Sequence, residues 1–242
     1  DCSVDHFTVG GVISGLVGSV VLQNNAGDDI TVTANGSFAF PTTVASGATY
    51  AVTVSTQPSS PTQTCVVTSG SGTVTSADIT SVRVECTTDT FAIGGTVTGL
   101  AGRGLVLQNN GGETLSIAAD GTFTFPTPVA SGASYAVTVM AQPTSPSQSC
   151  TVAMGSGTVG GAAVTDIAVT CVTRTFTIGG TVSGLAGTGL VLQDNGGDDL
   201  TIAADGTFTF STPVASGATF AVSVLAQPTG PSQTCTVSGG SG

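Results

Sequence analysis

Short runs of alternating apolar and polar residues recur along the whole chain. In SYAVTVM, the side chains of Tyr135, Val137 and Val139 fall on one side of an extended backbone, and Phe123 and Phe125 do the same in TFTF. Because successive side chains of a β-strand point to opposite faces, this period of two predicts strands with one face in a core and the other in solvent. No window shows a helical period. The pattern therefore predicts an all-β fold.

The same pattern occurs three times. FTVGGVISGL, FAIGGTVTGL and FTIGGTVSGL begin at Phe7, Phe91 and Phe176, which lie 84 and 85 residues apart. A unit of this length exceeds the roughly 20 to 50 residues of a solenoid repeat and fits a self-standing β-sandwich. We expect three tandem Ig-like antiparallel β-sandwich domains, arranged as beads on a string. They are called repeat 1, repeat 2 and repeat 3 and are expected to cover residues 1–86, 87–171 and 172–242.

Turn residues divide each repeat into short β-branched runs, and six or seven strands are expected per repeat. Asn-Gly or Asp-Gly pairs stand between alternating runs at three equivalent places: Asn35-Gly36, Asp120-Gly121 and Asp205-Gly206. A two-residue turn needs positive φ, which Gly, Asn and Asp tolerate, so these pairs are predicted to be hairpin tips. Six or seven strands joined in this way suit two packed antiparallel sheets.

The order of segments resembles that of bacterial surface proteins. GGTVSGL, LVLQ, NGGDD, DGTFTF, VASGATYAVTV and QP together look like the prealbumin-like and Cna-B-like sandwiches, and QTCTV, GSGTV and VTDIAVTC resemble tandem Ig-like repeats of long secreted or outer-surface proteins. The likeness covers nearly the whole chain and implies a sandwich fold outside the cell. One feature departs from it. Cna-B-like pilin domains are commonly cross-linked between Lys and Asn, and this chain has no Lys.

The charge balance excludes two classes of partner. Only 7% of residues are charged and the net charge is -11, with Arg83, Arg103 and Arg174 as the basic side chains. Nucleic-acid binding and attachment to anionic membranes both need clustered basic side chains, so neither is expected. No apolar run approaches the roughly 18 residues of a membrane-spanning helix, so no membrane span is expected.

Residues suited to catalysis are scarce. The chain has one His, no Lys, no Trp and two Tyr. His6 stands before Phe7, where the later repeats have Thr90 and Thr175, and a solvated linker residue is expected there. No nucleophile and base can be paired. We expect a protein that is not an enzyme and holds no cofactor.

The cysteines alternate between two equivalent positions per repeat: Cys2, Cys65, Cys86, Cys150, Cys171 and Cys235. No CxxC motif or Cys/His cluster offers a metal site, so disulfides and an oxidising compartment are expected. Two connectivities respect the repeat symmetry. The first joins Cys65 to Cys86 and Cys150 to Cys171; the second joins Cys2 to Cys65, Cys86 to Cys150 and Cys171 to Cys235.

Strand pairing favours the first connectivity. CVVTSG and SVRVEC read as antiparallel partners whose outer ends carry Cys65 and Cys86 opposite one another. Each bridge closes a loop of about 22 residues and is worth roughly 3 kcal/mol in the chain-entropy model. This connectivity leaves Cys2 and Cys235 without partners within the chain. The two are therefore candidates for an intersubunit disulfide.

Repeat 3 has no counterpart of the last predicted strand. TCTVSGGSG aligns with TCVVTSGSG of repeat 1, and residues 73–85 have no equivalent after it. A sandwich without this strand exposes an unpaired sheet edge and an open core. Two interpretations stay open: the sequence is a slice of a longer repeat array, or neighbouring copies associate head to tail and one supplies the strand or the cysteine.

Acidic turns are candidates for calcium binding. Asp28 and Asp29 in repeat 1, and Asp198 and Asp199 in repeat 3, stand beside Asn and Gly in oxygen-rich turns. No turn has the fixed ligand spacing of an established calcium motif. Asx residues with Gly are also what a tight turn requires, and this structural interpretation is favoured.

These features predict a structural role. The leading hypothesis is a secreted bacterial protein, a subunit or segment of a filament or surface stalk, whose partners are copies of itself or further repeats, end to end. Its motivating observations are the three repeats, the cysteine positions and the absent final strand. The alternative is an adhesin or an array of carbohydrate-binding modules that depends on calcium.

Overall fold

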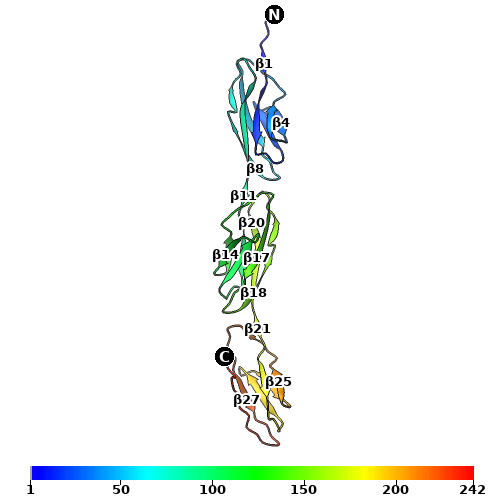
Figure 1. The fold of residues 1–242 in the computed structure, drawn as a ribbon, viewed down its shortest axis with the longest axis vertical. Coiled ribbons are helices and arrows are strands. Elements are labelled where there is room, and N and C mark those ends of the chain that lie inside the picture. The colour runs from blue at the N-terminus through cyan, green and yellow to red at the C-terminus, as the bar shows by residue number, and fades with distance from the viewer. Residues whose placement is uncertain (1) are drawn as a thin grey trace.

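The structure is a computed structural model that describes residues 2–242. The described residues form 27 strands and no helix. Three β-rich bodies follow one another along the long axis of the molecule, in chain order, and each corresponds to one repeat (Figure 1). The chain is all β, as the alternating pattern predicts.

Repeat 1 contains two four-stranded sheets. The first has the order β5-β2-β10-β8, formed by β5 (Gly36–Ala39), β2 (Val9–Ser14), β10 (Ile79–Thr88) and β8 (Gln63–Thr68). The second has the order β4-β3-β7-β9, formed by β4 (Asp28–Val32), β3 (Val20–Asn24), β7 (Thr49–Thr56) and β9 (Ser71–Thr73). A short pair precedes them, formed by β1 (His6–Phe7) and β6 (Val44–Ala45).

One hydrophobic core lies between these two sheets. Ile13 and Val84 from the first sheet and Leu22 and Val52 from the second belong to the same buried cluster, and each is at most 4% exposed. Strand β3 shows why the sequence folds in this way, because the residues of VVLQN alternate between buried and half-buried positions. Each inward side chain removes apolar surface from water, which is the main favourable term in folding. The arrangement is that of a β-sandwich.

Repeat 2 has the same arrangement. Its first sheet has the order β15-β12-β20-β18, formed by β15 (Gly121–Thr124), β12 (Ile93–Thr98), β20 (Val164–Thr173) and β18 (Gln148–Ala153). Its second sheet has the order β14-β13-β17-β19, formed by β14 (Glu113–Ile117), β13 (Leu105–Asn109), β17 (Ser134–Ala141) and β19 (Ser156–Thr158). The short pair is formed by β11 (Thr90–Phe91) and β16 (Val129–Ala130).

Repeat 3 has fewer paired strands among the residues described. A two-stranded sheet is formed by β22 (Gly179–Val182) and β25 (Gly206–Thr209), and a three-stranded sheet by β24 (Asp198–Ile202), β23 (Leu190–Asp194) and β27 (Val222–Ala226). The short pair is formed by β21 (Thr175–Phe176) and β26 (Val214–Ala215). Only four residues form its buried cluster: Leu190, Leu192, Ile202 and Phe210.

The expectation of purely antiparallel sheets is wrong. Strand β10 pairs with β2 in parallel, and β20 pairs with β12 in parallel, while the remaining pairs between strands are antiparallel. The reason lies in the elongated arrangement, since the chain enters a repeat at one end and leaves it at the other. The first long strand of a repeat, β2 or β12, then runs in the same direction as the last strand, β10 or β20, and the two are neighbours in one sheet.

The interpretation of Asn35-Gly36 and its equivalents as hairpin tips is also wrong. Strand β4 belongs to one sheet and β5 to the other, so this segment crosses between sheets. The side chain of Asn35 accepts a hydrogen bond from the backbone N–H of Leu16 and donates to its carbonyl oxygen, at 2.8 and 3.0 Å. The hairpin tips lie instead between β3 and β4, where Asn25 and Ala26 have positive φ.

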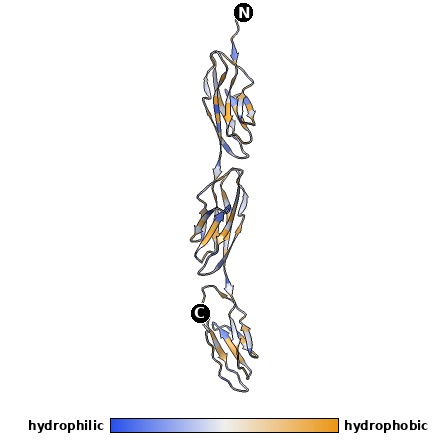
Figure 2. Cartoon of the chain, in the orientation of Figure 1, coloured by the Kyte–Doolittle hydropathy of each residue, from blue (hydrophilic) through white to orange (hydrophobic). Residues whose placement is uncertain are grey.

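Apolar residues alternate with polar ones along the strands of all three bodies (Figure 2).

Within residues 2–242, no helix has the length and apolar character needed to cross a membrane.

Candidate functional site

Each complete repeat clips its last strand to a neighbouring strand by a disulfide. Cys65 on β8 lies directly opposite Cys86 on β10 with their Cα atoms 3.9 Å apart, and Cys150 and Cys171 are related in the same way at 4.0 Å. The structure therefore has the first of the two connectivities. Disulfides of this buried kind are typical of proteins in oxidising compartments.

A glutamine supports each of these cysteine strands, a feature that sequence reasoning missed. Gln57 accepts a hydrogen bond from the backbone N–H of Cys65 at 2.7 Å and donates to its carbonyl oxygen at 3.0 Å. Gln142 and Gln227 make the same two bonds with Cys150 and Cys235. The available signal was the Gln-Pro pair that stands eight residues before a cysteine in all three repeats.

A second glutamine fixes the loop beside the disulfide. Gln148 is 1% exposed, and its Oε1 atom accepts hydrogen bonds from the N–H groups of Ala101 and Gly102 at 2.8 and 2.7 Å. Its Nε2 atom donates to the carbonyl oxygen of Gly99 at 2.7 Å and to the hydroxyl of Thr173 at 3.3 Å. A buried amide with all of these partners rigidifies its surroundings, because leaving any partner unpaired costs free energy.

The joint between repeats 1 and 2 is a hydrogen-bonded structure. Strand β10 ends at Thr88. The backbone N–H of Asp89 then donates to the carbonyl oxygen of Thr62 at 3.0 Å, and the backbone carbonyl oxygen of Asp89 accepts from the N–H of Ser131 at 2.9 Å. The Ser131 hydroxyl oxygen accepts from the N–H of Thr62 at 2.9 Å and the hydroxyl donates to the carbonyl oxygen of Gly160 at 2.8 Å. Loops of the two repeats are therefore bonded directly to each other.

Three of these contacts recur at the joint between repeats 2 and 3. Arg174 donates its N–H to the carbonyl oxygen of Ser147 at 3.0 Å and accepts from the N–H of Ser216 at 2.8 Å, and the N–H of Ser147 donates to the Ser216 hydroxyl at 2.9 Å. The residue between the strands differs, Asp in one joint and Arg in the other, so backbone atoms and a serine hydroxyl, rather than a particular charge, form the connection. The strand leading out of one repeat continues into the short first strand of the next (Figure 1).

The outer end of repeat 1 carries one half of the same joint. Ser46 is the counterpart of Ser131. Its N–H donates to the carbonyl oxygen of Asp5 at 2.8 Å, and its hydroxyl donates to the carbonyl oxygen of Thr75. Ser131 is 7% exposed beneath the preceding repeat, whereas Ser46 is exposed. At the far end of repeat 3, Ser232 and Thr234 hold the positions that Thr62 and Thr64 hold in the first joint.

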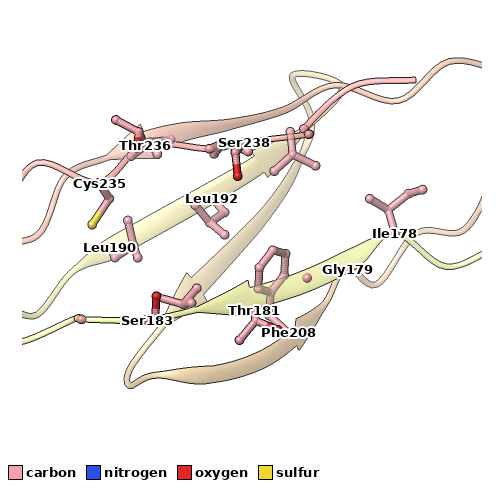
Figure 3. Close-up of a pocket in the computed structure, with 18 of the residues that line it drawn as sticks. Ile178, Gly179, Thr181, Ser183, Leu190, Leu192, Phe208, Cys235, Thr236 and Ser238 are labelled. Carbon is pink, nitrogen blue, oxygen red and sulfur yellow. The ribbon is translucent and has the colours of Figure 1, made fainter.

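A groove opens along repeat 3. Strand β22 and the segment 233–238 form its two rims, and the volume between them is about 430 Å³. Leu190, Leu192 and Phe208 lie along its interior (Figure 3). Cys235, half-buried and not in a disulfide, lies on one rim with its sulfur turned into the space between them. Within the described chain, no strand lies between the two rims.

The acidic turns serve as hydrogen-bond acceptors within their own repeats. Asp198 accepts from the N–H of Thr212 at 2.8 Å and from the hydroxyl of Ser211 at 2.9 Å, and these bonds, that from Thr212 first, lower the pKa of its carboxyl group. Asp199 and Asp29 accept from Gln193 and Gln23 at 2.6 and 2.7 Å. One Asp28 oxygen is buried without a partner. Among residues 2–242, no group of three or more metal-ligating side chains is brought together.

His6 and Cys2 lie apart from these features. His6 is exposed on β1, at the outer end of repeat 1, and Cys2 is exposed and unpaired in the same region. The structure therefore separates Cys2 and Cys235 onto repeats 1 and 3, at opposite ends of the string (Figure 1).

Comparison with known proteins gives a likeness among solved structures. The sequence matches no protein-family model and no curated protein. Among solved structures, the fold is similar to the Bacillus anthracis TIE protein, with a TM-score of 0.46 and 11% identity over 93% of this chain. The chain spans 46% of the length of that protein.

Proposed function

We propose that this chain is a non-enzymatic structural protein of the cell exterior, a segment or subunit of a bacterial filament or surface stalk. Its three Ig-like sandwiches follow one another end to end, and further repeats or further copies extend the string at its outer ends. The observation that carries the proposal is the joint, which occurs twice with the same backbone bonds although its central residue changes from Asp89 to Arg174.

The joints support a role in holding a fixed length and direction. A flexible linker lets its two domains move independently, and its reach depends on its composition. Here only Asp89 or Arg174 stands between the last strand of one repeat and the first strand of the next, and that residue is itself hydrogen-bonded to both repeats. The disulfides lie directly before the joints, at Cys86 and Cys171, so the strand that leaves each repeat is clipped covalently.

Small-angle X-ray scattering and electron microscopy of the purified chain test the proposal. We expect a rod with one narrow distribution of maximum dimension. Replacing Ser131 by Ala removes the hydroxyl that joins Thr62 to Gly160 and is expected to broaden that distribution, while Ser55→Ala, an exposed position on β7 outside the joint, leaves it unchanged.

Two results contradict the proposal. One is a purified chain whose three repeats reorient freely, because a string with loose joints does not transmit direction. The other is calcium-dependent binding to a glycan array that is abolished by Asp198→Ala together with Asp199→Ala, which would establish the adhesin alternative.

A further inference from the structure

We propose that the disulfides of repeats 1 and 2 limit how far each repeat lengthens when the string is under tension. Each bridge takes the segment between its two cysteines out of the loaded part of the chain. A reductant reaches the bridge, and frees that segment, only after the repeat has opened. The inference rests on the proposed function, because it concerns a string that bears load between its ends.

The bridge of repeat 2 stands where the chain leaves the repeat. Strand β20 ends at Thr173, and the next residue, Arg174, belongs to the joint with repeat 3. Cys171 lies on β20 just before that end, and its partner Cys150 lies on β18, at a sequence separation of 21 residues. A load applied at the joint therefore reaches Cys171 before it reaches the rest of β20.

Once the repeat opens, the bridge gives the load a shorter path through the chain. Tension passes from Cys171 through the two sulfur atoms to Cys150, and from there back along the chain toward β12. The residues between the two cysteines form a closed loop that carries no load. In repeat 1, Cys86 and Cys65 divide the chain in the same way.

The closed loop contains a large part of each repeat. In repeat 2, it includes β19 and most of β20, the strand that pairs with both β12 and β18. A fully extended chain spans about 3.5 Å per residue. A repeat with its bridge is therefore expected to lengthen by about 70 Å less than the same repeat without it, given the separation of 21 residues between the cysteines.

Burial protects the bridge while the repeat is folded. Cys150 is 3% exposed and Cys171 is 5% exposed, and both belong to the hydrophobic core of repeat 2. The side chain of Gln142 also bonds the backbone N–H and carbonyl oxygen of Cys150. Thiol–disulfide exchange requires a thiolate to reach one of the sulfur atoms. Opening the repeat disperses the core and brings the sulfur atoms into contact with solvent.

Release of the closed loop is a reduction by an external dithiol. Dithiothreitol breaks the S–S bond by thiol–disulfide exchange, so each cysteine sulfur gains one electron and one proton. Dithiothreitol loses two electrons and two protons and closes into a cyclic disulfide. The freed segment then joins the loaded chain, and the opened repeat lengthens by the remaining length of about 70 Å.

Single-molecule force spectroscopy of the whole chain, held at its two termini under constant load, tests the inference. Cys2→Ser and Cys235→Ser remove the two thiols that are not in disulfides. Without reductant, we expect repeats 1 and 2 each to open in a single step. With dithiothreitol, each of these steps is expected to be followed by a further step of about 70 Å. A chain kept in dithiothreitol without load for the same time is expected to retain both bridges, as measured by mass spectrometry after thiol alkylation.

Two matched insertions of ten Gly and Ser residues show which part of repeat 1 carries load. An insertion between Ser76 and Ala77 lies in an exposed segment inside the loop closed by Cys65 and Cys86. It is expected to leave the first step of repeat 1 unchanged and to lengthen its second step by about 35 Å. An insertion after Ala26, at the exposed turn between β3 and β4, lies outside the loop and is expected to lengthen the first step by the same amount and leave the second unchanged.

Three results overturn the inference. One is a first step that grows equally with both insertions, because the closed loop would then bear load. Another is the absence of a second step in dithiothreitol. The third is reduction of the bridges as fast without load as under load, because burial would then give no protection. The rod shape of the unloaded chain is measured separately, so the proposed structural function stands or falls on its own experiment.

Discussion

Repeats 2 and 3 have nearly the same sequence up to the equivalent residues Cys150 and Cys235 but differ in how well they are buried. Ile93 and Val97 of repeat 2 are at most 1% exposed, while Ile178 and Val182, which begin and end the same IGGTV segment in repeat 3, are half-buried. The difference arises from β20, which covers β12 and has no counterpart over β22 within residues 2–242. One strand therefore determines whether the same amino acids form a closed core.

The largest effect is expected from truncating equivalent isoleucines. Ile93→Ala leaves a cavity in a closed core and is expected to cost about 3 kcal/mol, whereas Ile178→Ala, at an already open groove, is expected to cost less than about 1 kcal/mol. Hydrogen exchange at β12 and β22 in the full chain measures the two local free energies of opening. Equal costs would show that repeat 3 is as closed as repeat 2.

Removing the disulfide of repeat 2 is expected to lower stability nearly as much as truncating Ile93. Replacing Cys150 and Cys171 together by Ala removes a bridge with a sequence separation of 21 residues, and the chain-entropy model gives a loss of about 3 kcal/mol. Cys235→Ala in repeat 3 breaks no bridge within the described chain and is expected to change stability little. Denaturant unfolding of both variants, compared under reducing and oxidising conditions, checks this contrast. A reductant that leaves the repeat 2 transition unmoved would contradict it.

A smaller contrast is expected at the loop glutamines. Gln148 bonds the loop that follows β12 and Gln233 bonds the loop that follows β22, but Gln148 is 1% exposed and Gln233 is only half-buried. Gln148→Ala leaves buried N–H groups unpaired and is expected to cost about 2 kcal/mol, while water can replace the Gln233 side chain at lower cost. Thermal unfolding of the two variants measures the two losses of stability. A larger loss from Gln233→Ala than from Gln148→Ala would contradict this prediction.

The smallest effect concerns pH. Hydrogen bonds from Thr212 and Ser211 lower the pKa of Asp198 below its ordinary value, so the charged form is favoured in the folded chain. The resulting stabilisation is present above the ordinary carboxyl pKa of about 3.9 and is lost as pH falls through the lower folded value. Glu113, its counterpart in repeat 2, bonds Thr127 through one oxygen.

An NMR titration of the side-chain carboxyl carbons resolves Asp198 from Asp78, whose pKa is lowered in the same direction by its bond from Thr8. We expect Asp198 to titrate below the ordinary value and Asp198→Asn to remove the corresponding loss of stability in acid. Titration of Asp198 at or above the ordinary value would contradict this assignment.

Sequence patterns predicted much of this molecule because its local signals agree with its packing. Alternation in SYAVTVM and TFTF indicated strands whose inward residues are buried, and the spacing of Cys65 and Cys86 on facing strands indicated the pairing that the structure has. Binary patterning and cross-strand register are properties of short segments, which is why they can be read without a structure.

Features that depend on distant segments were not predictable in this way. Asn35-Gly36 has the composition of a hairpin tip, but whether its flanking strands share a sheet is decided by packing of the whole repeat. The parallel pairing of β2 with β10 joins residues about 70 positions apart, and the serine contacts of the joints join two repeats. The glycines facing the last strand were visible in the sequence, but only the neighbouring backbone shows why they are needed.

The parallel pairing of the first and last strands also determines how a repeat responds to stretching. When a string of such repeats is pulled from its ends, β2 is drawn toward one end and β10 toward the other, along the line on which they lie side by side. All main-chain bonds between them then resist together in shear, instead of opening one after another like a zipper. The same topology that sends the chain in at one end and out at the other makes repeats 1 and 2 resist unravelling along the direction of the string.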